Sequence, residues 1–202
     1  MDTDISKKNI TTICNKENII LKLDKNSGIY SLEFNFENGK INIHKLLSSD
    51  LYNLIEKLNN DLIDKIEILK IYSENEVDVL FIFKRIGTEL GLPQKYMAIK
   101  TIKSNIGNNI CFKSTNIEYP KSKFIEKGIK FIEPLICEFG EMIIYNIHLS
   151  NVDLFYRFKI TTNDNLPVYM ENYIGLMMKK IFYKLKQFID KFDYNYYNNE
   201  AN

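Results

Sequence analysis

The sequence predicts an α+β fold in which a curved antiparallel sheet wraps around one long C-terminal helix. The first observation is a block of short segments, from residue 66 to residue 160, that reads as successive strands. The second is a helical period from residue 170 to residue 192, where apolar residues recur at steps of three and four. The third is that the sequence contains no internal repeat or linker, so one sheet and one helix must cover each other.

Two strands are expected before this block. Residues 20–23 and 29–36 read as strands, and in the second of them apolar residues alternate with polar ones. The Asn-Gly pair at 38–39 predicts a hairpin turn into a short strand at 41–43, because Asn-Gly suits a two-residue loop. Residues 1–17 are polar without a firm period, and we expect an arm or a short helix there.

An amphipathic helix, or two short pieces, is expected at 46–58, where leucine and isoleucine recur at helical spacing. The strands after it are separated by turn-forming residues such as Gly91, Pro93 and Gly140. They are expected at 66–72, 77–85, 96–103, 109–117, 129–139, 142–147 and 154–160.

The C-terminal helix has the strongest pattern in the chain. Asp164 or Asn165 can cap it, and Pro167 stands where a first-turn proline is tolerated. Its apolar face carries Met170, Ile174, Met177, Ile181, Leu185, Phe188 and Phe192. A sheet that grips such a helix leaves a space between them, and ligand pockets form in spaces of that kind.

Length and charge limit the class of protein. The 202 residues are expected to form one domain at 18–192, followed by a flexible tail at 193–202. There are 27 basic and 26 acidic residues, so nucleic-acid binding is not expected. No secretory signal is apparent and the apolar runs are far shorter than the roughly 20 residues of a spanning helix, which favours a soluble, cytoplasmic protein.

Motifs for catalysis and metal binding were not found. Three cysteines, none at CxxC spacing, favour free thiols over a disulfide framework or a zinc site. His44 and His148 have no metal-binding spacing, and there is no GxSxG elbow or P-loop. We therefore expect no catalytic residue, no metal and no cofactor.

Several segments, in their order and spacing, resemble a known family. Residues 114–120 run from a serine to a proline-containing loop, and a strand resumes at 129–131. Residues 163–167 end in Leu-Pro, Asn172 follows just inside the last helix, and Asn-Asp at 60–61 precedes a strand. From about residue 18 to residue 192 the chain resembles a START domain, the StAR-related lipid-transfer family.

The resemblance implies a helix-grip fold (START or Bet v 1-like) with an internal hydrophobic tunnel. It implies an intracellular carrier of one membrane lipid, with a phospholipid favoured over a sterol, that contacts membranes transiently and is not an enzyme. The loop at 118–128 and the start of the last helix would form a lid over the tunnel. The chain departs from the family in having no tryptophan, and Lys95-Tyr96 replaces a frequent arginine-aspartate pair.

Candidate ligand-binding residues follow from strand alternation, helical spacing and the resemblance. Phe81 falls where phosphatidylcholine-binding members place an aromatic cage residue, and Lys57 falls near their phosphate-binding arginine. The full set is Lys57, Val79, Phe81, Phe83, Arg85, Tyr156, Phe158, Tyr169, Met170, Tyr173, Met177 and Ile181. Phe81, Phe83, Tyr156 and Phe158 are more often plain core in such a pattern, and the alternative for Lys57 is a solvated helix residue.

Two other functions remain open. A protein-interaction module that kept the fold but filled the tunnel is compatible with the lost tryptophan and arginine-aspartate pair. An enzyme of the cyclase or hydrolase kind would need polar groups converging inside the cavity, and the sequence offers few. The identity of the lipid and the oligomeric state stay open.

Overall fold

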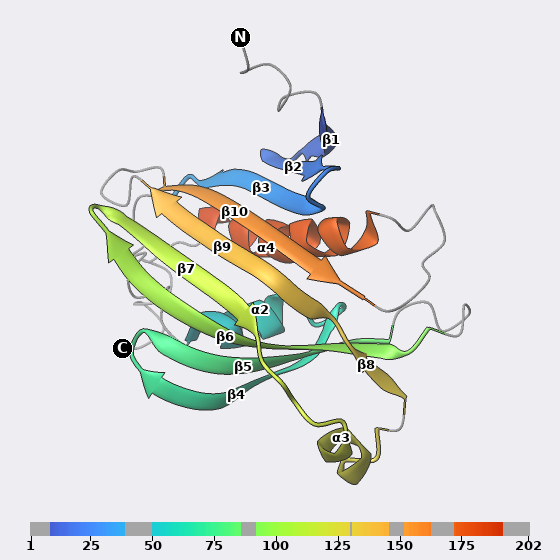
Figure 1. Ribbon diagram of the computed structural model, residues 1–202. Helices are drawn as coiled ribbons and strands as arrows, with labels where there is room; N and C mark the ends of the chain where they lie inside the picture. Colours follow the sequence, from blue (N-terminus) through green and yellow to red (C-terminus); the bar gives the residue numbers. More distant parts are fainter. Residues whose placement is uncertain are drawn as a thin grey trace.

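A ten-stranded sheet curves around two helices in the computed structural model, which describes residues 9–38, 50–85, 92–129, 131–145, 152–162 and 172–191 (Figure 1). The strands are β1 (Ile10–Lys16), β2 (Ile19–Asp24), β3 (Ile29–Phe36), β4 (Ile63–Ser73), β5 (Glu76–Phe83), β6 (Gln94–Ile106), β7 (Asn109–Asn116), β8 (Ile132–Pro134), β9 (Ile136–Tyr145) and β10 (Val152–Thr161). The helices are α2 (Asp50–Leu58), α3 (Ser122–Glu126) and α4 (Tyr173–Lys191).

The strands are ordered β1-β2-β3-β10-β9-β7-β6-β5-β4 across the sheet, and the short β8 runs parallel to β6. Because β10 pairs with β3, the last strand lies beside an early one, and α4 then crosses the sheet (Figure 1). The predicted α+β helix-grip architecture is confirmed. The expected strand at 41–43, the helix cap at 164–167 and the tail at 193–202 lie outside the described residues.

The N-terminal segment contains a strand, where the sequence suggested an arm or a short helix. Residues 10–16 form β1, which pairs with β2 at the edge of the sheet. The turn between them consists of Glu17 and Asn18, both at positive φ (62° and 57°), as the two-residue turns of β-hairpins require. Only Ile13 and Cys14 of this edge strand are half-buried and the other residues are exposed, so no buried set of residues alternates along it.

Gly140 was expected to separate two strands, and that expectation is wrong. It lies inside β9, opposite Ser114 of β7 and Phe158 of β10. A Cβ atom at this position would lie 3.1 Å from the Cβ of Ser114, which is tighter than ordinary contact. The glycine therefore permits close approach of neighbouring side chains and does not make a turn.

The two faces of the sheet carry two separate apolar clusters. On β5, Val79, Phe81 and Phe83 belong to the main core between the sheet and the helices. Leu80 and Ile82 point the other way and belong to a second cluster on the outer face. Successive side chains of a strand alternate between faces, so β5 is buried on both sides.

Helix α3 covers this outer cluster, and the expectation that residues 118–128 form a lid over the tunnel is wrong. Phe124 of α3 is fully buried and contacts Tyr96, with ring centroids 4.6 Å apart. Lys127 reaches Glu67 of β4 at 3.0 Å. Burial of Phe124 on the outer face is the physical reason, because it holds α3 on the side of the sheet away from α4.

Helix α4 is held on both flanks by ion pairs of its lysines. Lys179 is buried and lies 3.0 Å from Glu17 in the β1–β2 turn. On the other flank, Lys180 and Lys184 both bind the Asp61 carboxylate in the connection between α2 and β4.

None of the described helices is long and apolar enough to cross a membrane.

We expect Asp61→Asn to lower the free energy of unfolding by about 0.5–1 kcal/mol at neutral pH and low salt, as is typical of exposed ion pairs. The two lysines hold the pKa of Asp61 below its ordinary value, which is about 4. A carboxyl whose pKa is depressed by folding stabilises above that ordinary pKa and loses this contribution as the pH falls further. Urea unfolding at pH 7 and below pH 3, with Glu74→Gln as the exposed control, should show a smaller difference at the lower pH.

Candidate functional site

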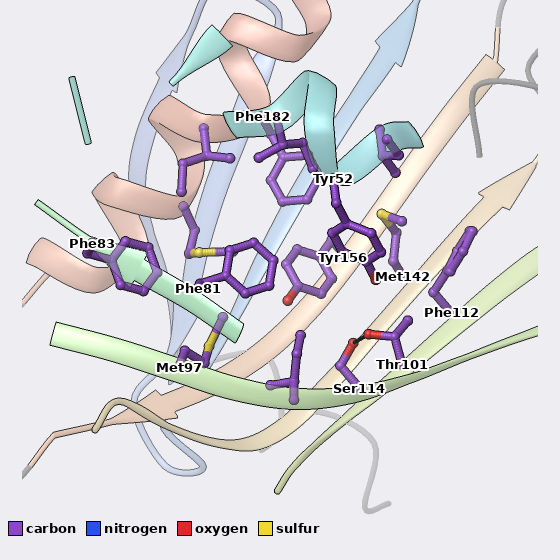
Figure 2. Close-up of a pocket in the computed structure, with 15 residues that line it drawn as sticks. Tyr52, Phe81, Phe83, Met97, Thr101, Phe112, Ser114, Met142, Tyr156 and Phe182 are labelled. Atoms are coloured by element: carbon purple, nitrogen blue, oxygen red, sulfur yellow. Dashed lines mark hydrogen bonds between the residues drawn. The ribbon is translucent and has the colours of Figure 1, made fainter. Parts of the chain in front are cut away.

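A cavity of about 110 Å³ lies between the concave face of the sheet and helices α2 and α4 (Figure 2). The strands contribute Phe81, Phe83, Met97, Ile99, Thr101, Phe112, Ser114, Met142 and Tyr156 to its wall. The helices contribute Leu51, Tyr52, Ile55, Met178, Ile181 and Phe182. Both helices therefore close a space whose floor is the sheet.

Six of the fifteen wall residues are aromatic, and several of their rings contact one another. Tyr52 of α2 meets Phe81 edge to face, with centroids 6.0 Å apart, and Phe81 stacks on Phe83 at 6.3 Å. Tyr156 of β10 contacts Phe182 of α4 at 5.3 Å. Ring pairs at such separations add stabilisation beyond area burial, so the wall is firm where these rings meet.

The few polar atoms of the wall are neutral hydroxyls. The hydroxyl oxygens of Thr101 and Ser114, on neighbouring strands, are 3.2 Å apart and share a hydrogen bond. Burial raises the pKa of Tyr52, and an interaction with the Thr101 hydroxyl opposes the rise. Burial also raises the pKa of Tyr156, with smaller effects from Cys137 and Tyr52. Both phenols therefore stay protonated at neutral pH.

The described lining contains no Asp, Glu, Lys, Arg or His side chain. The buried charged groups of the described residues lie elsewhere and have partners. Asp78 faces the outer side of the sheet, where it accepts a hydrogen bond from the Tyr72 hydroxyl at 3.0 Å. Lys186 donates to the carbonyl of Asn35 and to Asp190. The cavity thus offers apolar surface and hydroxyl groups, and no acid–base pair.

Four of the twelve predicted ligand-binding residues line the cavity, namely Phe81, Phe83, Tyr156 and Ile181. Val79, Phe158 and Met177 are buried in the adjoining core, and Tyr173 packs against it. The structure brings these residues to one side of the sheet, as the alternation predicted.

The two predicted cations do not lie in the cavity wall. Lys57 is exposed on α2. Arg85 is exposed beyond the end of β5, where its Nε donates to the carbonyl of Leu92 at 3.2 Å and its guanidinium lies 5.6 Å from the ring of Phe131. Tyr169 and Met170 lie outside the described residues.

Sequence reasoning named Lys57 on α2 but missed the apolar residues that this helix contributes, and it missed the two strand hydroxyls. Leu51 and Ile55 are the buried residues of α2, and their spacing of four was a visible signal for the face that α2 turns inward. Thr101 and Ser114 face the cavity because β6 and β7 pair in the register that sets them opposite each other. No local sequence pattern predicts that pairing register.

The described residues form no metal centre, and two of the three cysteines are buried. No group of three His, Cys, Asp or Glu side chains in the described part of the chain is placed to hold a metal ion. Cys111 and Cys137 are buried free thiols, and burial raises the pKa of Cys137 to about 11. A thiol that is protonated at neutral pH is a poor nucleophile.

An antiparallel sheet gripping a C-terminal helix over an apolar cavity defines the helix-grip class of fold. In fold, the chain is similar to solved structures of human StAR-related lipid-transfer domains. Human STARD10 superimposes with a TM-score of 0.71 at 9% identity, covering 95% of this chain and 76% of that one. The lipid transfer and protein localization domain of human StarD13 (DLC2) gives 0.69 at 8% identity, with 91% and 90% covered.

Human StAR-related lipid transfer protein 5 gives a TM-score of 0.68 at 8% identity, covering 92% of this chain and 88% of that one. No protein-family model matches the sequence, and no curated protein sequence matches it. The chain therefore has a START-like fold over nearly its whole length, established by structure and not by sequence identity.

Proposed function

We propose that this protein binds one membrane lipid between α4 and the sheet and carries it between membranes without chemically changing it. The observation that carries the proposal is the cavity, whose described wall has no charged side chain and is mostly aromatic and aliphatic. Burial of a lipid tail is favourable by about 0.8 kcal/mol per methylene group, so apolar walls alone supply the binding energy. Two of the similar structures bear names that refer to lipid transfer.

A whole lipid needs more room than the cavity has at rest. About 110 Å³ is well below the roughly 300–1,000 Å³ of common ligand pockets. Uptake therefore requires α2 or α4 to move outward. Three methionines of the wall, Met97, Met142 and Met178, can change rotamer at little cost and adapt to a lipid chain.

Native mass spectrometry tests the proposal. The purified protein is measured before and after incubation with mixed liposomes, and any bound molecule is extracted and identified. We expect a mass increase that corresponds to one lipid per chain. A mass that stays at the apo value after incubation would overturn the proposal.

The head group is the finer part of the proposal. The sequence favoured a phospholipid, with Lys57 and Arg85 as candidates for its phosphate. Neither side chain lines the cavity, and the described wall has no other cation. An uncharged lipid head suits this wall better, because an ionised group buried without a partner is strongly disfavoured.

We therefore expect Lys57→Gln and Arg85→Gln to change lipid uptake by less than twofold. The physical reason is that both cations are exposed and outside the wall, where solvent screens their attraction for a phosphate. Uptake of phosphatidylcholine and of a sterol from liposomes is measured for each variant. A tenfold loss specific to phosphatidylcholine would restore the phosphate role.

Contact with a membrane is a further part of the proposed function, with a cytoplasmic location. The exposed α3 carries Ile125 at 61% exposure beside Lys123, on the outer face of the sheet. Lysines near an anionic membrane surface contribute about 1 kcal/mol each, and an exposed isoleucine can enter the interface. Flotation with anionic and neutral vesicles measures the contact.

A protein-interaction module with a filled cavity is the second candidate, favoured by the small resting volume of the cavity. In that case α4 would stay closed and no lipid would be taken up from liposomes. The same native mass measurement separates the two candidates, because only the carrier gains mass.

A further inference from the structure

The hydroxyl groups of the cavity wall lie close together. Thr101 and Ser114 share a hydrogen bond, Tyr52 interacts with Thr101, and Tyr52 lies near enough to Tyr156 to contribute to the raised pKa of Tyr156. Figure 2 shows the side chains of all four turned toward the cavity, among aromatic and methionine side chains. A single polar spot therefore interrupts an otherwise apolar wall.

Tyr156 has a fixed ring and a hydroxyl group that can bond a ligand. Its ring is fixed on two sides, by Phe158 at 4.9 Å and by Phe182 at 5.3 Å. The side chain is half-buried, and within the described part of the chain no hydrogen bond involves its hydroxyl group. Because this hydroxyl faces an apolar cavity and has a free hydrogen-bonding capacity, a ligand atom that bonds it there is bound more tightly.

The chemistry of the spot selects the partner. A hydroxyl group donates one hydrogen bond and accepts others, so four hydroxyl groups can satisfy an oxygen that both donates and accepts. A phosphate, carboxylate or ammonium group would be desolvated here without an opposite charge, since the described wall contains none. An alkyl end would leave the Tyr156 hydroxyl unpaired.

We propose that the polar spot formed by Tyr52, Thr101, Ser114 and Tyr156 binds an uncharged hydroxyl head group of the ligand. Tyr156 is the residue that determines this specificity. This inference rests on the proposed function and names the class of ligand for the same cavity: apolar alcohols, and not lipids whose buried end is charged. The aromatic and methionine walls then hold the apolar body of the alcohol.

The test compares four probes with one tail and different ends: octane, 1-octanol, octanoate and octyl phosphate. Dissociation constants are measured by NMR titration for the wild type, Tyr156→Phe and Thr101→Val. We expect the wild type to bind 1-octanol at least tenfold tighter than either charged probe. Tyr156→Phe should weaken 1-octanol by roughly fivefold to tenfold, the usual effect of one lost hydrogen bond, and should leave octane unchanged.

Tyr96→Phe is the matched control, because the Tyr96 hydroxyl bonds the carbonyl of Tyr119 on the outer face of the sheet. It should leave all four dissociation constants unchanged. The inference is overturned if a charged probe binds as tightly as 1-octanol, or if Tyr156→Phe weakens octane and 1-octanol equally. If none of the probes binds, the proposed function fails and the inference fails with it. Melting temperatures of the variants confirm that each is folded.

Discussion

Ile99→Trp should reduce lipid uptake at least tenfold while the protein remains folded. Ile99 of β6 is buried and lines the cavity, so a larger ring at this position occupies the space that a ligand needs. The cavity has only about 110 Å³ at rest, and the indole fills a large part of it. Uptake is measured with a fluorescent lipid transferred from liposomes, and folding is followed by circular dichroism and thermal unfolding.

Ile102→Trp provides the control for this change on the same strand. Ile102 is 45% exposed and does not line the cavity, so the same substitution adds no bulk to it. Uptake by this variant should equal that of the wild type. Full uptake by Ile99→Trp would mean that the ligand binds elsewhere, and the cavity would lose its assigned role.

Gly175→Ala should destabilise the protein by about 2–3 kcal/mol, although alanine favours a helix more than glycine does. Gly175 lies in α4 where the helix crosses β3, and an added Cβ would lie 2.5 Å from the ring of Tyr30. That ring cannot easily retreat, because it stacks on Phe158 with centroids 5.4 Å apart. The helix must therefore shift away from the sheet. Urea unfolding measures the loss.

Leu176→Ala is the control, since Leu176 is the next residue of α4 and is 43% exposed. It should change the unfolding free energy by well under 1 kcal/mol. A smaller side chain in place of Tyr30 should also relieve the clash. The double variant Gly175→Ala, Tyr30→Leu should therefore lose less unfolding free energy than the sum of the losses in the two single variants. Additive effects would contradict direct contact between helix and ring.

Alternation in the sequence was enough to predict most of the sheet and one wall of the cavity. Phe81 and Phe83 share a face because strand side chains repeat every two residues, and both line the cavity. The helical spacing of α4 likewise placed Ile181 inward. These features depend on local periodicity, which can be recognised in a single sequence.

The remaining features depend on pairing between distant segments. Thr101 and Ser114 read as ordinary strand polar residues, and only the β6–β7 register sets them together inside the cavity. Gly140 read as a turn because its tight contact with Ser114 lies across two strands. Phe124 read as part of a loop, while the outer cluster that buries it is assembled from β5, β6 and β8.

Methyl NMR of the methionines tests most directly whether the cavity under α4 is the lipid site. The chain has six methionines, of which Met97, Met142 and Met178 line the cavity, while Met177 is buried in the adjoining core. With 13C-methyl labelling and a titration with a sterol or a fatty alcohol, we predict that the signals of the three cavity methionines move most and saturate at one ligand per chain. If a ligand binds and the signals of these three methionines do not move, the cavity is not the lipid site. If no ligand binds at all, the assignment of the cavity is contradicted as well.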